Sequence, residues 1–302
     1  MTTSADRPDT IEDYTEWAKT ALAVDFGAGP IRRQYDTNVS ALQNAIQKTS
    51  LIRNLTQFLS EQNRLCAERT GAELLLSCDF TILTKPFDSA VEKSFRHNVI
   101  NNLKFPEPPE STWVTPQNWY DCFDDLVRGT LICRFFDGPS TLAKALDQYV
   151  AENGLKARHV PRSNDRGYYA FHHYTEFSTD ILDSEWNMRT VRAQLEIQLT
   201  TQLQEVLRSL THPLYEHLRT KARSRDENWK WEHETPRFRT SYLGHTLHMI
   251  EAVILQVRDS VHLRQQDAEP SMERLDFDGH SAAVDTRDVP IETAPESERE
   301  AE

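Results

Sequence analysis

The feature that most constrains the fold is a strictly alternating segment, VRAQLEIQLTT, at residues 191–201. Its apolar positions are Val191, Ala193, Leu195, Ile197 and Leu199. This period of two predicts a β-strand with one face toward a hydrophobic core and one polar face. The polar face carries Glu196 between Gln194 and Gln198, an arrangement that a merely solvated strand does not need. We therefore interpret this face as a functional surface.

Helical and extended segments surround this strand. Apolar residues recur at steps of three and four over residues 35–69, which predicts helix, and further helices are expected at 138–150 and directly after the alternating strand. Residues 125–136 and 167–177 are two more strand candidates, and 105–119 is a proline-rich connection. Strands separated by single helices predict an α+β or α/β domain. We assign the α+β class: a mixed β-sheet flanked by helices, with helical N- and C-terminal extensions.

The last predicted helix, at residues 241–261, carries an apolar stripe at alternating steps of four and three. Its members are Leu243, Leu247, Ile250, Ile254, Val257 and Val261. Such a heptad-like stripe fits either packing against the N-terminal helices or a short dimer seam. We favour packing and keep a homo-oligomer as the alternative.

Negative charge is concentrated at the C-terminal end. Residues 264–302 hold twelve acids and four arginines, so this tail carries −8 of the net charge of −13. Its composition predicts disorder, with partner binding or autoinhibition as its role. The four cysteines are scattered without a C-x-x-C pair, and neither a secretory signal nor an apolar run of 18 residues is present. We therefore expect a soluble, cytoplasmic protein without a membrane span.

Two charged clusters could carry chemistry. Lys85, Ser89 and Lys93 are spaced by four, so on a helix they would share one stripe and could bind phosphate oxygens. A solvated lysine face is the alternative. Asp124 and Asp125 stand at the start of the strand at 125–136, where carboxylates could hold Mg²⁺ beside phosphates or cap a turn.

The other two strand candidates add polar groups that could bind a nucleotide. Tyr168 and His172 have the same parity in an extended chain and would share a face. A tyrosine could stack on a base and a histidine could bond a phosphate or sugar, although strand aromatics often belong to the core. Glu196 could hold a metal or activate a hydroxyl group.

Several common catalytic patterns are missing from the sequence. It contains no P-loop, no G-x-G-x-x-G, no G-x-S-x-G elbow and no histidine followed by aspartate. His245 and His248 lack the helical H-E-x-x-H pattern and cysteine partners, so we interpret them as packing or capping residues.

Four motifs taken in order resemble the RelA/SpoT-type nucleotide pyrophosphokinase family. They are K-x-x-x-S-x-x-x-K at 85–93, D-L at 125–126, G-Y-x-x-x-H at 167–172 and E-I-Q at 196–198. The resemblance covers about residues 40–217 and implies a nucleotidyltransferase-like synthetase fold in a small, synthetase-only member. It divides the chain into an N-terminal arm (1–34), a synthetase domain (35–217), a C-terminal helical extension (218–262) and a disordered acidic tail (263–302).

The resemblance also implies a reaction. An ATP-dependent pyrophosphokinase of this family transfers the β,γ-pyrophosphate of ATP to the 3′-hydroxyl of a purine nucleotide, as in (p)ppGpp (guanosine tetraphosphate) synthesis and the stringent response. By position, Asp125 and Glu196 would be catalytic and hold Mg²⁺. The acceptor would be bound by Tyr168, His172 and Gln198. The ATP would be bound by Lys85, Ser89, Lys93, Arg128 and Arg134.

Three positions depart from the family pattern, which usually has an arginine at each of them: Leu83, Thr130 and Thr200. Strand parity offers replacements, because Arg128 and Arg134 share a face with Thr130. Arg192 likewise shares parity with Glu196.

Two other functions remain open. A toxin-like relative would pyrophosphorylate the 3′ end of tRNA, and cations near aromatic residues could grip that RNA. The candidate clusters are Arg219, Lys221, Arg223 and Arg225 with Trp229 and Trp231, and Lys156, Arg158, Arg162 and Arg166 before Tyr168. We favour solvated loop charge for both clusters. The chain could also be a catalytically silent nucleotide- or partner-binding protein, although retention of both carboxylates speaks against this.

Overall fold

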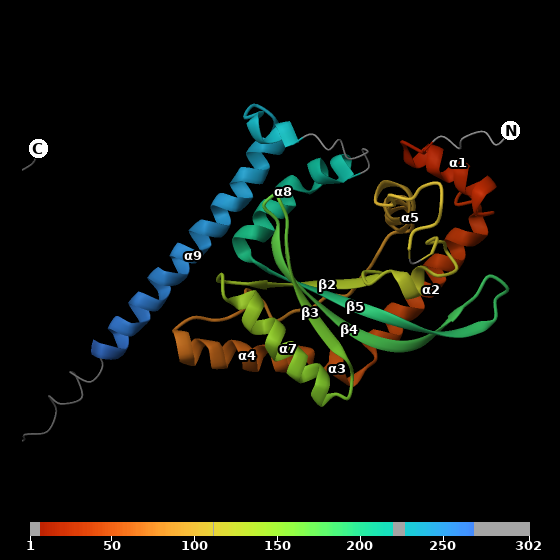
Figure 1. Ribbon diagram of the computed structural model, residues 1–302. Coiled ribbons are helices and arrows are strands. Elements are labelled where there is room, and N and C mark those ends of the chain that lie inside the picture. Colours follow the sequence, from red (N-terminus) through yellow and green to blue (C-terminus); the bar gives the residue numbers. More distant parts are fainter. Residues whose placement is uncertain (1–6, 111, 220–226, 269–302) are drawn as a thin grey trace, which may run out of the picture. The chain divides into compact units, whose positions relative to one another are not determined.

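Five strands form one mixed sheet in the computed structural model, which describes residues 7–110, 112–219 and 227–268 (Figure 1). The strands are β1 (Leu83–Thr84), β2 (Val127–Cys133), β3 (Ala157–Ser163), β4 (Tyr169–Leu182) and β5 (Met188–Thr201). Their order across the sheet is β1-β2-β5-β4-β3, with β2 and β5 parallel and the other pairs antiparallel. This sheet and its flanking helices confirm the α+β prediction.

The helices precede, connect and follow the strands. They are α1 (Ile11–Ala21), α2 (Gly29–Gln47), α3 (Ser50–Arg53), α4 (Leu55–Thr70), α5 (Phe87–Phe95), α6 (Trp119–Cys122), α7 (Gly138–Glu152), α8 (Gln202–Arg219) and α9 (Pro236–Ala268), with a π-helical turn η1 (Arg96–Ile100) and a 3₁₀ turn η2 (Glu227–Trp231). No described helix is long and apolar enough to cross a membrane.

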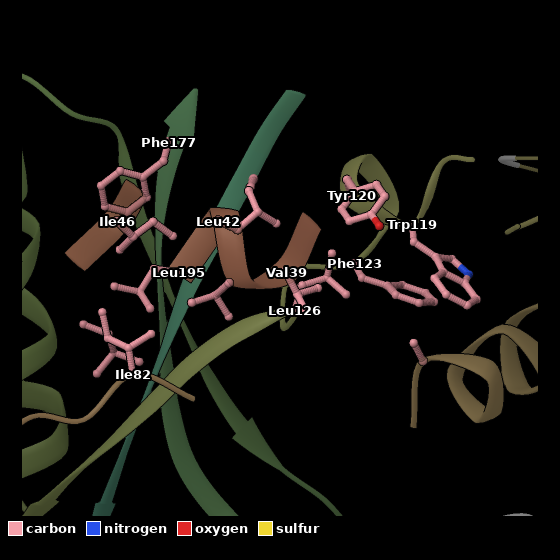
Figure 2. Packing of buried hydrophobic residues seen from close by; sticks show 14 of the residues in the cluster. Val39, Leu42, Ile46, Ile82, Trp119, Tyr120, Phe123, Leu126, Phe177 and Leu195 are labelled. Atoms are coloured by element: carbon pink, nitrogen blue, oxygen red, sulfur yellow. The ribbon is translucent and has the colours of Figure 1, made fainter. Parts of the chain in front are cut away.

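The alternation along β5 places its apolar side chains on one face of the sheet and its polar side chains on the other, as predicted. The five apolar residues that define the pattern are each at most 2% exposed. They face α2 and α7, which pack on the same side of the sheet (Figure 1). Figure 2 shows Leu42 and Ile46 of α2 beside Phe177 of β4 and Leu195 of β5. With this face closed by helices, the polar face is left to carry the candidate site.

The N-terminal segment is more structured than the predicted arm. Helix α1 begins at Ile11 with a capping box between Thr10 and Asp13. Tyr14 and Ala18 of α1 are fully buried, and α2 begins at Gly29 rather than near Tyr35. Aromatic side chains join these helices to α5 and α6 around the fully buried Trp119. Residues from Ile11 onward therefore belong to the folded core.

Strand β3 was not predicted from the sequence. Pro161 stands in its middle, which lowers its strand propensity, and its side chains are mostly exposed. A proline is tolerated because β3 lies at the edge of the sheet and pairs only with β4. This strand brings Arg158 and Arg162 to the edge of the polar face.

The interpretation of the apolar stripe on α9 as a packed face was wrong. Five of its members are 40–58% exposed: Leu243, Ile250, Ile254, Val257 and Val261. Helix α9 instead contacts the rest of the chain through its other side, where Ser241 and Glu251 are buried. The homo-oligomer alternative stays a prediction.

Among the described residues, those up to His262 form one compact unit. The acidic tail that the sequence predicts to be disordered lies, apart from the end of α9, outside the described residues.

Candidate active site

Two lysines clamp Asp125 at the entrance to β2. Lys85 Nζ lies 2.9 Å from Asp125 Oδ2, and Lys93 Nζ lies 2.6 Å from Asp125 Oδ1. Lys93 is on α5, whereas Lys85 lies between β1 and α5, so the prediction of one helical stripe from Lys85 to Lys93 was wrong. The two ammonium groups converge through the packing of β1 on β2 rather than through helical spacing. Ser89 lies on α5, one turn before Lys93, and is half-buried.

The burial of this cluster shifts its proton equilibria. Burial opposes the charge on Asp125, but the ammonium groups of Lys93 and Lys85 outweigh it and hold the pKa of Asp125 below its usual range. Burial also lowers the pKa of Lys85, and the opposing effect of the Asp125 carboxylate offsets this lowering only in part. The cluster therefore concentrates positive charge around one carboxylate that stays ionised.

A chain of polar contacts extends across the sheet from Glu196. This side chain is buried, and Glu196 Oε1 lies 2.7 Å from His172 Nδ1 and accepts a hydrogen bond from Gln198 Nε2 at 3.1 Å. Tyr168 Oη lies 2.8 Å from His172 Nε2. The two ring nitrogens of His172 thus link Glu196 to Tyr168. The structure thus brings the three residues that the sequence assigned to the acceptor, Tyr168, His172 and Gln198, together with Glu196.

The strand register connects the lysine clamp with this chain. Arg128 of β2 lies opposite Glu196 of β5, Glu196 lies opposite Tyr174 of β4, and Tyr174 lies opposite Arg158 of β3. Arg128 is also close enough to Lys85 to disfavour its charged form. One row of side chains therefore runs from the clamp, past Glu196, to the edge of the sheet.

The sequence prediction of the site missed the contribution of the edge strand. Arg158 donates to Asp124 Oδ2 at 2.9 Å and to Gln194 Oε1 at 3.2 Å, and its guanidinium lies 4.0 Å from the centroid of the Tyr174 ring. Arg162 donates to Tyr174 Oη at 3.5 Å. The sequence did contain a sign of this contribution, because Arg158 and Arg162 have equal parity and would share one face of a strand. Pro161 between them argued against a strand, so the strand was not predicted.

The structure does not bring Arg134 to the site. It follows the last residue of β2, donates to Leu75 O at 3.1 Å and forms an ion pair with Glu73 at 2.7 Å. Six residues separate it from Arg128, which corresponds to about 20 Å along an extended strand. Arg192 shares the polar face but is exposed and pairs with Ser178, four residues from Glu196. Of the replacement cations considered, Arg128 alone lies opposite Glu196.

The three departures from the family pattern have different surroundings. Leu83 is 56% exposed and pairs with Arg128, Thr130 is half-buried opposite Gln198, and Thr200 is buried. Of the cations on the polar face, Arg128 lies close to two of these positions, opposite Leu83 and two residues before Thr130.

The structure describes only part of the first cluster that the sequence analysis considered for RNA binding. Lys221, Arg223 and Arg225 lie outside the described residues, and Arg219 is the last residue of α8. Trp229 is buried beneath Arg237, whose guanidinium lies 4.6 Å from its ring centroid, whereas Trp231 is 86% exposed. Trp229 is therefore committed to packing.

A metal ion at this site would have few protein ligands. Within the described ranges, no group of three or more histidine, cysteine, aspartate or glutamate side chains could hold a metal ion. Mg²⁺ needs only one or two protein carboxylates when phosphate oxygens and water complete its shell. Asp125, two residues before β2, and Glu196, on the strand paired with β2, are the carboxylates that such a site would use. Asp125 already contacts two ammonium groups, so a metal would compete with them.

This arrangement separates two chemical tasks. Lys85, Lys93 and Arg128 present cations that suit the oxygens of a polyphosphate. Glu196, with His172 and Gln198, presents a carboxylate whose orientation is fixed by two neighbours and which could accept a proton. The arrangement thus combines groups that suit phosphate oxygens with a positioned carboxylate that could act as a base.

The chain was compared with known families, curated proteins and solved structures. No protein-family model matches the sequence, and no curated protein matches it. The structure is similar to small alarmone synthetase 1 from Bacillus subtilis bound to its product pppGpp, at 14% identity and a TM-score of 0.43, covering 77% of this chain and 95% of that one.

Two further solved structures are similar at the same level. A GTP pyrophosphokinase family protein from Streptococcus pneumoniae is 15% identical with a TM-score of 0.43, covering 77% of this chain and 93% of that one. Small alarmone synthetase 2 from Bacillus subtilis is 17% identical with a TM-score of 0.38, covering 69% and 98% respectively. A likeness at this level assigns no activity to this chain, so the activity has to be argued from its own side chains.

Proposed function

We propose that this chain is an ATP-dependent pyrophosphokinase that transfers the β,γ-pyrophosphoryl group of ATP to the 3′-hydroxyl of a purine nucleotide, as in (p)ppGpp synthesis. The observation that carries the proposal is the row of side chains on the polar face. It joins the clamp of Lys85, Lys93 and Asp125 to Glu196 through Arg128. The ordered sequence motifs, which resemble those of RelA/SpoT-type enzymes, select this reaction among the phosphoryl transfers that such a site could perform.

The reaction assigns a task to each half of the site. The acceptor 3′-oxygen attacks the β-phosphorus of ATP, the bond from that phosphorus to the α,β-bridging oxygen breaks, and AMP leaves with this oxygen. The hydroxyl proton passes to Glu196, whose buried carboxylate is held by His172 and Gln198. Lys85, Lys93 and Arg128 hold the phosphate oxygens in line and stabilise their negative charge.

Mg²⁺ is the proposed cofactor, with Asp125 and Glu196 as its protein ligands. When bound, it would supply neutralisation of phosphate charge beyond that of the lysines. Binding of ATP phosphates to Lys85 and Lys93 would release Asp125 from its two ion pairs, so the carboxylate becomes available as the phosphates arrive.

Tyr168 and His172 form the acceptor side of the proposed site. The Tyr168 hydroxyl is tied to His172, which orients the phenol ring toward the polar face. An aromatic ring in this position offers a stacking surface for a purine base. His172 then links the base-binding residue to Glu196, so acceptor binding and proton acceptance share one hydrogen-bonded chain.

The RNA-directed alternative has one structural observation in its favour. Arg158 and Arg162 are exposed on the edge strand beside the site, where they could contact an RNA backbone. Both, however, also contact groups of the site itself, Asp124 and Tyr174. We therefore keep tRNA as a second candidate acceptor behind a free nucleotide.

The test is transfer of label from γ-labelled ATP in the presence of Mg²⁺, with GDP, GTP, ADP and bulk tRNA offered separately. We expect labelled product from a purine nucleotide. Glu196→Gln should reduce the rate by about 10²- to 10⁴-fold, the usual contribution of a positioned base, while ATP binding persists. Label in tRNA alone would select the RNA-directed activity. ATP binding without transfer to any acceptor would indicate a silent nucleotide-binding protein.

A further inference from the structure

Helix α9 contacts the loop that carries Tyr168. Gly167 has a φ of +74°, a conformation that favours glycine. A Cβ atom placed on Gly167 would come within 2.5 Å of Ser241 O, and one on Gly244 within 2.4 Å of Gly167 O. The two backbones therefore touch directly, and Gly244 of α9 permits this approach. The contact lies one residue before Tyr168.

Two histidines of α9 reinforce this contact. His245 Nδ1 lies 2.7 Å from Tyr169 Oη, and His245 Nε2 lies 3.2 Å from the carbonyl oxygen of Asp165. Since a carbonyl only accepts, Nε2–H donates to Asp165 and Nδ1 accepts from the Tyr169 hydroxyl. His248 stacks on the Tyr169 ring with centroids 3.5 Å apart and an angle of 2° between the planes. The histidines thus hold both sides of the turn that contains Gly167.

The turn itself transmits this restraint to Tyr168. Asn164 O accepts from Gly167 N at 3.1 Å, Asn164 N donates to Tyr168 O at 3.3 Å, and Asn164 Oδ1 accepts from Arg166 N at 2.9 Å. The loop is therefore a closed turn whose position is fixed by its contacts with α9. Displacing α9 would move the backbone from which Tyr168 projects.

Helix α9 is itself anchored at the carboxyl end of β5 and near α7. Glu251 contacts Thr201 through a hydrogen bond and accepts from Gln204 Nε2 at 3.3 Å. Arg258 forms a bidentate pair with Asp137 at 3.0 and 3.1 Å. These anchors give the histidines a fixed base from which to hold the loop.

We propose that His245 and His248 are positioning residues that hold Tyr168 in place for the acceptor nucleotide, so that α9 forms part of the acceptor half of the site. The role assigned to Tyr168 rests on the proposed function. The lysine clamp makes no use of α9, so loss of either histidine weakens acceptor binding and leaves ATP binding unchanged.

The decisive variants are His248→Ala, which removes the stacked ring, and His248→Phe, which retains an aromatic ring. Met249→Ala is the matched control, because Met249 is the next residue of α9 and is 66% exposed. Amide hydrogen exchange over residues 164–172 of the full chain measures the loop, and titrations with GDP, GTP and ADP measure acceptor binding. A separate titration with a non-hydrolysable ATP analogue measures the donor side.

We expect His248→Ala to accelerate exchange in residues 164–172 and to weaken acceptor binding about three- to tenfold, the range for loss of one aromatic pair. His248→Phe should restore both, and Met249→Ala should change neither. Unchanged exchange in His248→Ala would overturn the proposal, as would weakening of the ATP analogue by the same factor.

A second, milder variant tests the same contact in case His248→Ala fails to fold. Tyr169→Phe removes the hydroxyl group that His245 contacts and keeps the ring that His248 stacks on, so it should also accelerate exchange in the loop. If it does not, His245 has no positioning role. Absence of nucleotide binding in the unmodified protein, together with faster loop exchange in the variants, would refute the proposed acceptor site and leave the structural restraint intact.

Discussion

The two carboxylates of the candidate site differ because of their neighbours. Asp125 lies between two ammonium groups, whereas Glu196 lies beside an imidazole and an amide. Strong cationic neighbours suit a carboxylate that stays charged. A base that accepts and releases a proton needs less opposing charge. In the proposed reaction, these surroundings suit Glu196 as the base, in addition to its proposed role as a metal ligand with Asp125.

The ion pairs of Asp125 predict a specific dependence of stability on pH. The folded-state pKa of Asp125 lies below its value in the unfolded chain, which is about 3.9. Its stabilising contribution is therefore complete well above pH 4 and is lost as the pH falls toward the folded-state pKa. Asp125→Asn should lower the free energy of unfolding at pH 7 by about 3 kcal/mol, since it leaves two partly buried lysines without a partner.

Urea unfolding of both proteins from pH 7 to pH 2.5 measures this difference. The loss of stability below about pH 4 should be shallower in Asp125→Asn. Asp88→Asn is the control, because the ion pair of Asp88 with Arg32 is exposed and should contribute at most about 1 kcal/mol. Parallel pH curves for the unmodified protein and Asp125→Asn would show that the clamp does not stabilise the fold.

At the level of elements, the register of the parallel pair β2–β5 decides which cations reach the site. Strand parity alone treated Arg128 and Arg134 as equal replacements for the missing arginines. The register places Arg128 opposite Glu196, whereas Arg134 follows the strand and pairs with Glu73. The parity of a residue number determines which face of the sheet the side chain occupies. Which residues lie next to it on that face depends on the register with the neighbouring strand, which parity does not give.

This difference predicts unequal effects of two similar substitutions. Arg128→Ala should raise the KM for ATP by about tenfold or more, corresponding to loss of a hydrogen bond to a charged group. Arg134→Ala should leave this KM unchanged. Steady-state kinetics with varied ATP and fixed acceptor measures both. Equal effects of the two variants would contradict the register-based assignment.

The elements themselves could be predicted where their patterns were strong. The alternation at 191–201 and the apolar run after Asp125 both formed strands, and residues 138–150 formed a helix. Strand β3 was missed because of Pro161, and Lys85 was misplaced because β1 is only two residues long. Tyr168 and His172 could be placed on one face from parity. Their proximity to Glu196 depends on the register of β4 and β5, and the convergence of Lys85 and Lys93 on Asp125 depends on tertiary packing.

At the scale of the compact unit, the N-terminal helices are part of the core. Tyr14 is fully buried, stacks on Phe95 with centroids 5.3 Å apart and accepts a hydrogen bond from Asn98 Nδ2 at 2.8 Å. Burial raises the pKa of its hydroxyl group. These contacts join α1 to α5 and η1, the helical segment that carries Lys93. The α1 helix therefore supports the phosphate side of the site.

Tyr14→Ala should destabilise the whole unit. Removal of a buried aromatic ring typically costs about 3–5 kcal/mol, which should appear as one lowered thermal transition. Thr20→Ala is the control on the same helix, because Thr20 is exposed and its loss should change stability by at most about 0.5 kcal/mol. A Tyr14→Ala protein with unchanged Tm would show that this segment is an arm outside the folded core, as the predicted division of the chain implied.

The central claim is that this chain moves a pyrophosphoryl group rather than a single phosphate. The most direct measurement is the quantity of AMP and ADP formed per labelled acceptor in reactions with γ-labelled ATP and Mg²⁺, with Glu196→Gln as the inactive control. The account predicts one AMP for each acceptor that gains label, no matching ADP, and loss of both products in the control. Formation of ADP in step with labelled acceptor, or no acceptor-dependent AMP with any nucleotide or tRNA, would contradict it.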